Sequence, residues 1–402
     1  MKILMVNKFL YPRGGSESYM LYLGQHFQKM GHDVQYFGMY DEKNTVGNAA
    51  GMYTQNMDFH SKGLGRFLYP FKIIYSFEAK KKIMRVIDDF KPDVVHMNNI
   101  NFQLTPSIIY GIKKKGVPVV QTVHDYQMIC PNHLLYNFDQ NTPCEKCVNG
   151  SYVSCIKNKC IHGSLVKSIL GALEARFYSL LKPYKKVDLF VCPSNFLEKK
   201  LLSANGYYKS KTKTIHNFIN KEKFSNNDLK EGDYILFVGR LSKEKGIENI
   251  KGTAELLPEY TFVVAGNGPD EELLKDVQNI KLAGFLTGDE LTELMGSAKV
   301  LLLPSVCYEN CPLSILEAHS LGVPVVTMNS GGMAELVKNG VTGTLVNEPT
   351  PTGIAQKLKE TIENEDYYKT LKENCKNEKD NILSVQTYAD ILIEEYEKLA
   401  KE

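Results

Sequence analysis

The chain has 402 residues, a formal net charge of +2 and 43% hydrophobic residues. This composition excludes a mainly disordered chain, and the small net charge excludes a global footprint for nucleic acid. No apolar run approaches the ~18–20 residues that span a bilayer, and the N-terminus lacks the cleavage pattern of a signal peptide, so we expect a cytoplasmic protein of about two domains.

Short apolar runs alternate with helical patterns along the whole chain. In the first half, the predicted strands are residues 2–7, 33–37, 93–97, 118–123 and 188–192, and the predicted helices are residues 16–30, 79–90 and 106–115. In the second half, strands are predicted at 234–239, 261–265, 300–304 and 324–328, and helices from about 246, at 270–277 and at 313–321. Continuous apolar strands separated by helices are typical of parallel sheets covered on both faces. The predicted fold class is therefore α/β, with two doubly wound, Rossmann-like domains.

The boundary between the two series is predicted near residue 222. Residues 209–233 are polar and lack a clear period, which is typical of a linker. The sign of the charge also changes there, because residues 1–222 carry +14 and residues 223–402 carry −12. The predicted parts are an N-terminal domain at 1–222 with a cysteine-rich insertion at 130–162, a C-terminal domain at 223–380, and a terminal helix at 381–402. That helix has Leu392, Tyr396 and Leu399 on one side and is predicted to pack back toward the N-terminal domain.

The strongest chemical signal is the segment YENCPLSILEA at residues 308–318, which follows a predicted strand and opens a helix. The free N–H groups and the positive dipole end of a helix N-terminus hold phosphate, and carboxylates accept hydrogen bonds from sugar hydroxyls. Glu309 and Glu317 are eight residues apart, so one lies at the mouth of the helix and the other about two turns in. The alternative interpretation is a helix with an acidic first turn and no ligand.

Three further motifs follow predicted strands, and doubly wound domains bind ligands at the carboxyl ends of their strands. In GRLSKEKG at 239–246, Arg240 and Lys245 offer a guanidinium and an ammonium to a diphosphate, and a solvated basic turn is the alternative. The pair Gly14–Gly15 lets a ligand approach the backbone without interference from a Cβ, although a glycine pair is also found in ordinary turns. His124 in TVHD is interpreted as functional, with a structural histidine as the alternative.

Taken together, these motifs closely resemble family 4 glycosyltransferases, which have the GT-B fold. The resemblance rests on the order of Gly14–Gly15, His124–Asp125, GRLxxxKG, and E-x7-E followed by GVPVV, and it covers the chain from Lys2 through Gly343. It implies retaining transfer of a sugar from a nucleotide-diphosphate sugar, with UDP as the family-level expectation. No D-x-D sequence is present, so we expect no metal-binding motif of this kind and no cofactor required for transfer.

The resemblance also implies roles for individual residues. Arg240 and Lys245 would stabilise the leaving diphosphate, Glu309 would contact hydroxyls of the donor sugar, and His124 would approach the transferred sugar; these four form the predicted catalytic set. The predicted donor-binding set is Gly14, Gly15, Leu286, Asn310, Cys311, Leu313, Ser314 and Glu317. Within it, the two glycines would close over the diphosphate, Glu317 would hold the ribose hydroxyls and Leu286 would lie by the nucleobase.

The chain departs from the family pattern at two places. It has Glu309-Asn310-Cys311-Pro312 where the family often has Glu-Gly-x-Pro, which bears on the shape of the sugar pocket. It also has HNFIN at 216–220 where Pro-Asn-Gly-Val-Asp is common, which bears on contacts of the linker.

Five of the nine cysteines fall between residues 130 and 160. The spacing of Cys144, Cys147, Cys155 and Cys160 suits a structural tetrahedral zinc site, which would staple a loop of low apolar content. Reduced thiols without a metal are the alternative, and the sequence leaves both open.

Residues 60–85 interleave Lys and Arg with Phe and Tyr, a composition typical of a segment that lies on anionic lipid. An ordinary solvated helix is the alternative. The expected partners are a nucleotide-sugar donor and a glycan or lipid-linked acceptor, with peripheral contact to the anionic inner face of the cell membrane and no nucleic acid.

The leading hypothesis is therefore a glycosyltransferase in the synthesis of a cell-surface polysaccharide. A nucleotide-sugar epimerase on a similar fold is the second hypothesis, and the E-x7-E and GRLxxxKG motifs argue against it. A non-catalytic protein that binds nucleotide sugars or glycans is the third, and the intact set of His124, Arg240, Lys245 and Glu309 argues against that.

Overall fold

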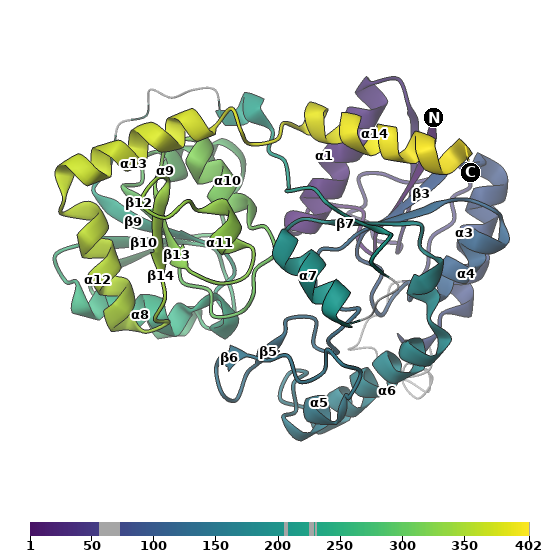
Figure 1. Ribbon diagram of the computed structural model, residues 1–402, viewed down its shortest axis with the longest axis horizontal. Coiled ribbons are helices and arrows are strands. Elements are labelled where there is room, and N and C mark those ends of the chain that lie inside the picture. The colour runs from purple at the N-terminus through teal and green to yellow at the C-terminus, as the bar shows by residue number, and fades with distance from the viewer. Residues whose placement is uncertain (56–72, 205–207, 225–228, 230, 402) are drawn as a thin grey trace. The chain divides into compact units, whose positions relative to one another are not determined.

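The computed structural model describes residues 1–55, 73–204, 208–224, 229 and 231–401 (Figure 1). The chain divides into two compact units. The first comprises Met1–Leu134, Glu145–Ile215 and Val385–Glu402, and the second comprises Leu135–Cys144 and His216–Ser384. Each unit contains one parallel six-stranded sheet with helices around it, which confirms the predicted α/β class with two doubly wound domains.

The sheet of the first unit has apolar, buried central strands, and its edge strand at Thr212–Thr214 is polar and half-buried. The strands of this sheet are β1 (Lys2–Val6), β2 (Asp33–Phe37), β3 (Val94–Met97), β4 (Val119–Thr122), β7 (Leu189–Cys192) and β8 (Thr212–Thr214). Their order is β2-β1-β3-β4-β7-β8, and all pairs are parallel. The strand order therefore reverses at β1, which lies between β2 and β3.

The helices of the first unit include the terminal helix of the chain. They are α1 (Gly15–Lys29), α3 (Phe77–Phe90), α4 (Ser107–Lys114), α5 (Val153–Lys157), α6 (Leu165–Leu181), α7 (Asn195–Ala204) and α14 (Val385–Lys401), with a 3-10 turn at Pro183–Lys186. Helix α14 packs on α1, where the hydroxyls of Tyr19 and Tyr388 lie 2.8 Å apart. Tyr396 and Leu392 are also fully buried on this side of α14, while Leu399 is half-buried.

The second unit repeats the arrangement. Its strands are β9 (Tyr234–Val238), β10 (Thr261–Ala265), β11 (Ile280–Gly284), β12 (Val300–Leu303), β13 (Val325–Met328) and β14 (Gly343–Val346), in the parallel order β11-β10-β9-β12-β13-β14. Its helices are α8 (Ile247–Leu256), α9 (Gly288–Gly296), α10 (Leu313–Ser320), α11 (Met333–Leu336), α12 (Pro351–Ile362) and α13 (Glu365–Glu378), with 3-10 turns at Lys221–Phe224, Lys243–Lys245 and Glu271–Leu274. A short antiparallel hairpin, β5 (Tyr136–Asn137) and β6 (Thr142–Pro143), belongs to the same unit.

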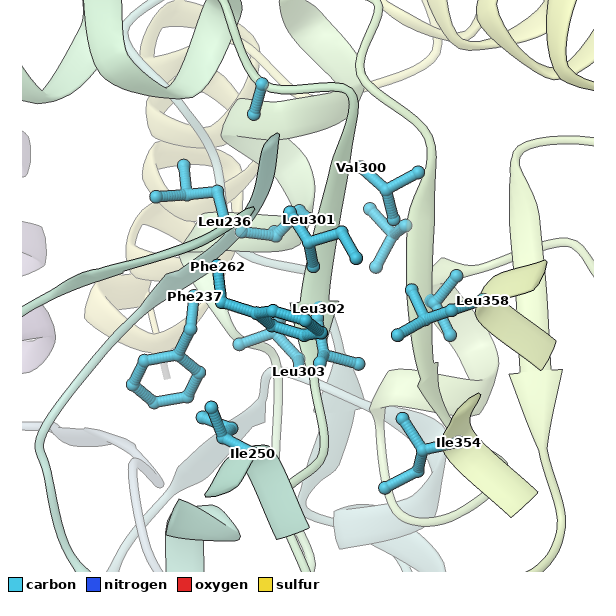
Figure 2. Packing of buried hydrophobic residues seen from close by; sticks show 14 of the residues in the cluster. Leu236, Phe237, Ile250, Phe262, Val300, Leu301, Leu302, Leu303, Ile354 and Leu358 are labelled. Atoms are coloured by element: carbon cyan, nitrogen blue, oxygen red, sulfur yellow. The ribbon is translucent and has the colours of Figure 1, made fainter. Parts of the chain in front are cut away.

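The core of the second unit lies between its central strands and two covering helices (Figure 2). Phe237, Phe262 and Leu302 from β9, β10 and β12 are almost completely buried, and they pack with Ile250 of α8 and Leu358 of α12. Burying side chains of this size contributes about 1.5–3 kcal/mol each. This packing holds β9 and β12 rigidly side by side.

Three features differ from the sequence-based expectations. The chain passes from the first unit to the second between Ile215 and His216, inside the predicted linker, and that linker contains β8, the edge strand of the first sheet. The predicted helix at 270–277 is wrong. That segment forms only a 3-10 turn, with N–H groups bonded three residues back, because Leu274 and Val277 are its only buried apolar side chains. The strands β11 and β14 were missed; both lie at the edges of the sheet, and β11 has no buried side chain to give it an apolar pattern.

None of the helices in the described part of the chain is long and apolar enough to cross a membrane.

Gly246 allows the turn after β9 to meet the end of β12. Its φ of +79° lies in the left-handed region, and a Cβ built there would come within 2.1 Å of the carbonyl oxygen of Pro304.

We expect Gly246→Ala to lower the midpoint of urea unfolding of the second unit, through left-handed strain of about 1–2 kcal/mol and the added clash with backbone. Gly288→Ala is the matched control in the same unit, because Gly288 has a φ of +63° and open space around its Cβ position. Equal effects of the two substitutions would contradict the proposed clash.

Candidate active site

The candidate site in the second unit begins where its strand order reverses. Strand β9 pairs with β10 on one side and with β12 on the other, so the loops that follow β9 and β12 leave the same edge of the sheet next to each other. The first loop contains GRLSKEKG and the second contains Glu309. In doubly wound sheets, this reversal point is where ligands bind.

Glu244 ties the two loops together. Its backbone carbonyl accepts hydrogen bonds from the N–H groups of Val306 and Cys307, at 3.0 and 3.3 Å. Its carboxylate accepts a hydrogen bond from the Ser242 hydroxyl at 2.6 Å, and the residue is buried. These contacts fix the turn that presents Lys245 toward the loop after β12.

Lys245 and Glu309 form a direct ion pair through Nζ and Oε1. The Ser305 hydroxyl donates a second hydrogen bond to the same carboxylate oxygen at 2.9 Å. The side chains of Lys245 and Glu309 are 30% and 16% exposed, so a ligand can still reach them. Burial works against the charge of Lys245, but the facing carboxylate of Glu309 outweighs it and holds the pKa of the ammonium above its usual value.

A glycine-rich loop after β13 supports the backbone of Glu309. The N–H of Gly332 donates to the Glu309 carbonyl at 2.7 Å, and Gly331 has a φ of +61°. A Cβ at Gly331 would come within 2.7 Å of the same carbonyl oxygen. The close approach therefore requires glycine, and it fixes the direction of the loop that carries Glu309.

Helix α10 starts directly after this loop, with Pro312 at its N-cap. Leu313 and Ser314 occupy its first turn and are half-buried, and Glu317 lies in its second turn. No side chain caps this N-terminus among the described residues, so its N–H groups are available to an anion.

The linker that enters the second unit packs against this loop. The Asn217 side chain donates to the Cys311 carbonyl at 3.0 Å, and the Asn217 N–H points at the Cys311 sulfur. Burial raises the pKa of the Cys311 thiol to about 12, so it stays protonated at neutral pH. The side chain of Cys311 thus has a structural role at the departure ENCP, while its predicted backbone contact with the donor stays a prediction.

The structure therefore brings part of the predicted set into direct contact. Lys245 and Glu309 touch, and Asn310, Cys311, Leu313, Ser314 and Glu317 lie along the same loop and helix. Arg240 follows β9 in the same loop as Lys245 and is exposed. Leu286 is half-buried in the turn between β11 and α9, and its role at a nucleobase stays a prediction.

The first unit has its own polar cluster at the carboxyl edge of its sheet. Asn7 and Lys8 follow β1, Asn98 follows β3, and His124 and Asp125 follow β4. Burial lowers the pKa of the Lys8 ammonium, although Asp125 and Glu17 act in the opposite direction. The cluster surrounds the strand reversal at β1, which is again the expected place for a ligand.

His124 is held in this cluster as a neutral imidazole. Its Nε2 lies 2.9 Å from the Asn98 side-chain oxygen, and the ring packs edge-on against Tyr19 at 5.0 Å between centroids. Burial lowers the pKa of His124 to about 4, and Asp125 offsets this only in part. With Nε2–H donated to Asn98, Nδ1 is left as an acceptor.

A buried network beneath His124 reaches the terminal helix. The Thr122 hydroxyl lies 2.7 Å from Nε2 of His96 and 3.1 Å from the Tyr19 hydroxyl. The other ring nitrogen of His96 meets the hydroxyl of Tyr396, and burial lowers the pKa of His96 to about 3. Helix α14 therefore contributes hydroxyl groups that support β4, the strand that precedes His124.

Gly14 and Gly15 lie at the N-terminus of α1, where Gly14 is the N-cap and both are exposed. Gly14 is extended, with a φ of −163°, so its backbone does not require glycine there. Their predicted closure over a diphosphate stays a prediction.

Sequence patterns gave no signal for several residues at the two sites. Asn7, Asn98 and Lys8 are single polar residues after strands, and only the order of β1, β3 and β4 brings them together. Glu244 acts through hydrogen bonds between loops some sixty residues apart in the chain, and Ser305 acts through its hydroxyl on Glu309 within the second of these loops. The SGG sequence at 330–332 was a usable signal, because it follows a predicted strand and repeats the pattern of Gly14–Gly15.

The cysteine-rich insertion forms a buried cluster of three thiols, Cys147, Cys155 and Cys160. The neighbouring thiols Cys160, Cys147 and Cys130 contribute to a raised pKa of Cys155, with the hydrogen bond to Cys160 as the largest cause. Cys144 is not part of this cluster, and none of the nine cysteines forms a disulfide. No group of three or more His, Cys, Asp or Glu within the described residues is arranged to hold a metal ion. The zinc hypothesis stays a prediction, and elemental analysis of the purified protein would decide it.

Half of the basic aromatic segment at 60–85, residues 60–72 with Lys62, Arg66 and Lys72, lies outside the described part of the chain. The remainder enters α3, whose Ala79, Ile83 and Val86 face the core.

Comparisons with known proteins bear on both units. The model of glycosyltransferase family 4 matches residues 13–223, and the model of group 1 glycosyl transferases matches residues 218–378. An uncharacterized 42.6 kDa protein in the cps region of Klebsiella pneumoniae is 28% identical over 354 residues, which cover 84% of this chain and 87% of that protein.

Solved structures share the fold at low identity. HepE of Anabaena, crystallised with UDP and glucose, has a TM-score of 0.70 and 17% identity, covering 99% of this chain and 100% of that one. Sucrose-phosphate synthase from Thermosynechococcus elongatus has a TM-score of 0.70 and 14% identity, covering 99% of this chain and 98% of that one. At these identities the likeness shows the GT-B fold and does not carry over a ligand.

We expect the imidazole of His124 to stay neutral from pH 8 down to about pH 5 and to titrate near pH 4. Because its folded pKa lies below the value of about 6.5 in an unfolded chain, its contribution to stability is present above pH ~6.5 and is lost as the pH falls toward 4. NMR titration of the ring protons, assigned with a His124→Asn variant, would measure this. A midpoint near 6.5 would mean that the ring is solvated and charged in weak acid.

Proposed function

The chain belongs to glycosyltransferase family 4, and we propose that it is a retaining enzyme that transfers a sugar from a UDP-sugar to a glycan or lipid-linked acceptor in cell-surface polysaccharide synthesis. The family makes it a glycosyltransferase. The nucleotide, the sugar, the acceptor and the stereochemistry are the proposal.

The observation that carries the proposal is the arrangement of Lys245, Glu309 and the N-terminus of α10. An ammonium, a carboxylate and a set of backbone N–H donors gather at the strand reversal of the second unit. A nucleotide-diphosphate sugar presents the complementary groups, which are two phosphates and a ring of hydroxyls.

Each group then has a task in the reaction. Negative charge grows on the leaving diphosphate as the bond to the sugar breaks, and preorganised cations and N–H dipoles stabilise that charge. We assign this task to Arg240, Lys245 and the N–H groups of Leu313 and Ser314. Glu309 accepts hydrogen bonds from the donor sugar, and Glu317 accepts them from the ribose.

The ion pair of Lys245 with Glu309 gives the site a resting state. Both charges are partly withdrawn from water and satisfied by each other and by Ser305, so neither is left unpaired before the donor arrives. When the donor binds, its phosphates and hydroxyls can share these partners without a large rearrangement. We therefore treat Glu309 as a ligand for hydroxyls of the donor sugar rather than as a nucleophile.

Two comparisons support the choice of donor and pathway. The structure of HepE contains UDP and glucose, and the Klebsiella pneumoniae relative lies in a cps region. Screening the protein against UDP-, GDP- and ADP-sugars by thermal shift would identify the nucleotide. NMR of the product anomer, once an acceptor is found, would test retention.

Binding of a nucleotide sugar without turnover on any acceptor would favour the binding-protein alternative. Interconversion of the donor sugar without an acceptor would favour the epimerase. Peripheral contact with an anionic membrane and a zinc staple in the insertion remain part of the proposal, and neither takes part in the chemical step.

We expect Lys245→Ala and Glu309→Ala each to lower turnover about 100-fold or more, measured as release of nucleoside diphosphate from the donor sugar. Lys245 acts on the charge of the leaving group, and Glu309 orients the sugar. Lys243→Ala is the matched control, because Lys243 lies in the same 3-10 turn and has no assigned role. We expect it to keep nearly normal turnover.

Each variant must retain the fold, which circular dichroism and the unfolding midpoint would establish. Near-normal turnover in Lys245→Ala or Glu309→Ala would remove that residue from the catalytic set. An equal loss in Lys243→Ala would mean that the turn as a whole, rather than Lys245, is needed.

A further inference from the structure

Helix α6 exposes its apolar side to solvent and buries its polar and small residues. Its exposed side chains, here called the α6 face, are Leu165, Val166, Ile169, Leu173, Leu180 and Leu181. Val166 is 67% exposed, Leu173 is 53% exposed and Leu180 is 63% exposed. The buried residues of the helix are Ser168, Gly171, Ala172, Glu174 and Tyr178. This is the reverse of the usual arrangement, in which the apolar stripe of a surface helix packs on the core.

The α6 face is one continuous stripe. Val166, Ile169, Leu173 and Leu180 recur at intervals of three, four and seven residues, which places them on one side of a helix. Val153 of the neighbouring α5 is also exposed. Seven of the fifteen large apolar side chains exposed in the described part of the chain fall between residues 153 and 181. Such clustering marks an interaction surface, since apolar residues scattered singly are normal.

The charge around the α6 face has one sign. Residues 153–187 contain seven Lys or Arg and a single acid, Glu174, which is buried on the other side of α6. Lys167, Arg176, Lys182, Lys185 and Lys186 are all exposed. A ring of cations around an apolar stripe is complementary to a surface that is apolar inside and anionic at its rim.

Aromatic side chains extend the same surface toward α3. Phe177 of α6 packs edge-on against Tyr75, and Tyr75 packs against Phe77, which is 77% exposed. The ammonium groups of Lys80 and Lys186 both lie over the ring of Tyr110, and the Tyr110 hydroxyl donates to the Leu181 carbonyl. Basic and aromatic groups of three helices therefore adjoin one end of the α6 face.

We propose that the α6 face docks the first unit on an anionic lipid bilayer, with α6 lying in the plane of the interface. A helix of 17 residues is about 25 Å long, which suits an interfacial element. The stripe would enter the acyl boundary while the lysines contact lipid phosphates. This inference rests on the proposed transfer to a lipid-linked acceptor. The α6 face would bring the enzyme to the bilayer that holds this acceptor.

The test is co-flotation of the whole protein with vesicles of phosphatidylcholine, with and without about 30 mol% phosphatidylglycerol. We expect binding to the anionic vesicles that weakens at least tenfold between about 50 and 500 mM salt, and little binding to pure phosphatidylcholine. The variant Val166→Glu/Leu173→Glu should lose at least tenfold in vesicle affinity. Lys185→Ala/Lys186→Ala should lose roughly tenfold on anionic vesicles only.

The matched control is Leu256→Glu/Leu273→Glu, which places the same charges at exposed apolar positions of the second unit. It should bind vesicles as the unmodified protein does. All substituted positions of the α6 face are exposed, so we expect unfolding midpoints close to that of the unmodified protein. If Val166→Glu/Leu173→Glu does not fold, Lys185→Ala/Lys186→Ala provides the test instead, because it leaves the apolar stripe intact.

The proposal is overturned if the unmodified protein does not bind anionic vesicles at low salt, or if Val166→Glu/Leu173→Glu binds them unchanged. It is also overturned if the unmodified protein is a dimer that this variant dissociates and no vesicle binding is seen, because the α6 face would then serve a second copy of the chain. Donor turnover without vesicles separates the two proposals. Vesicle binding without turnover on any donor would reject the enzymatic function alone, and normal turnover without vesicle binding would reject the α6 face alone.

Discussion

The pairing of β9 with β12 is the constraint on which the donor site depends. Because the strand order reverses there, two loops that are some sixty residues apart in the chain leave the sheet side by side. Core packing fixes the two strands, and the carbonyl of Glu244 then joins the two loops through N–H groups of the second. The contact of Lys245 with Glu309 is a consequence of this backbone geometry rather than its cause.

Buried basic groups have different protonation behaviour in the two units. In the second unit, a carboxylate facing Lys245 keeps the ammonium charged in a partly dry site, which is the state that a phosphate needs. In the first unit, burial without a comparable partner keeps His124 neutral and lowers the pKa of Lys8. Desolvation thus disfavours the charged form in both units, and the pKa stays high only where a counter-charge faces the cation.

Much of the fold could be predicted because the strands of a doubly wound sheet are buried on both faces and read as continuous apolar runs. Residues 33–37 and 261–265 were predicted with the bounds that the structure has. The failures lie where burial is partial. The edge strands β8 and β11 have few buried side chains, so their residues resemble a loop in sequence, and the acidic segment after residue 270 has too little apolar surface to complete a helix.

By itself, the sequence determined the fold class, the family and the motif residues Lys245 and Glu309, because these depend on local pattern and on spacing along the chain. Only the tertiary structure decided which groups surround them. Gly332 and Glu244 act through contacts that strand order creates, and Asn98 meets His124 for the same reason. It also decided the role of α6. An apolar stripe at helical spacing is expected to face the core, but small residues on the opposite side of α6 allow the closer packing, so the stripe is left in solvent.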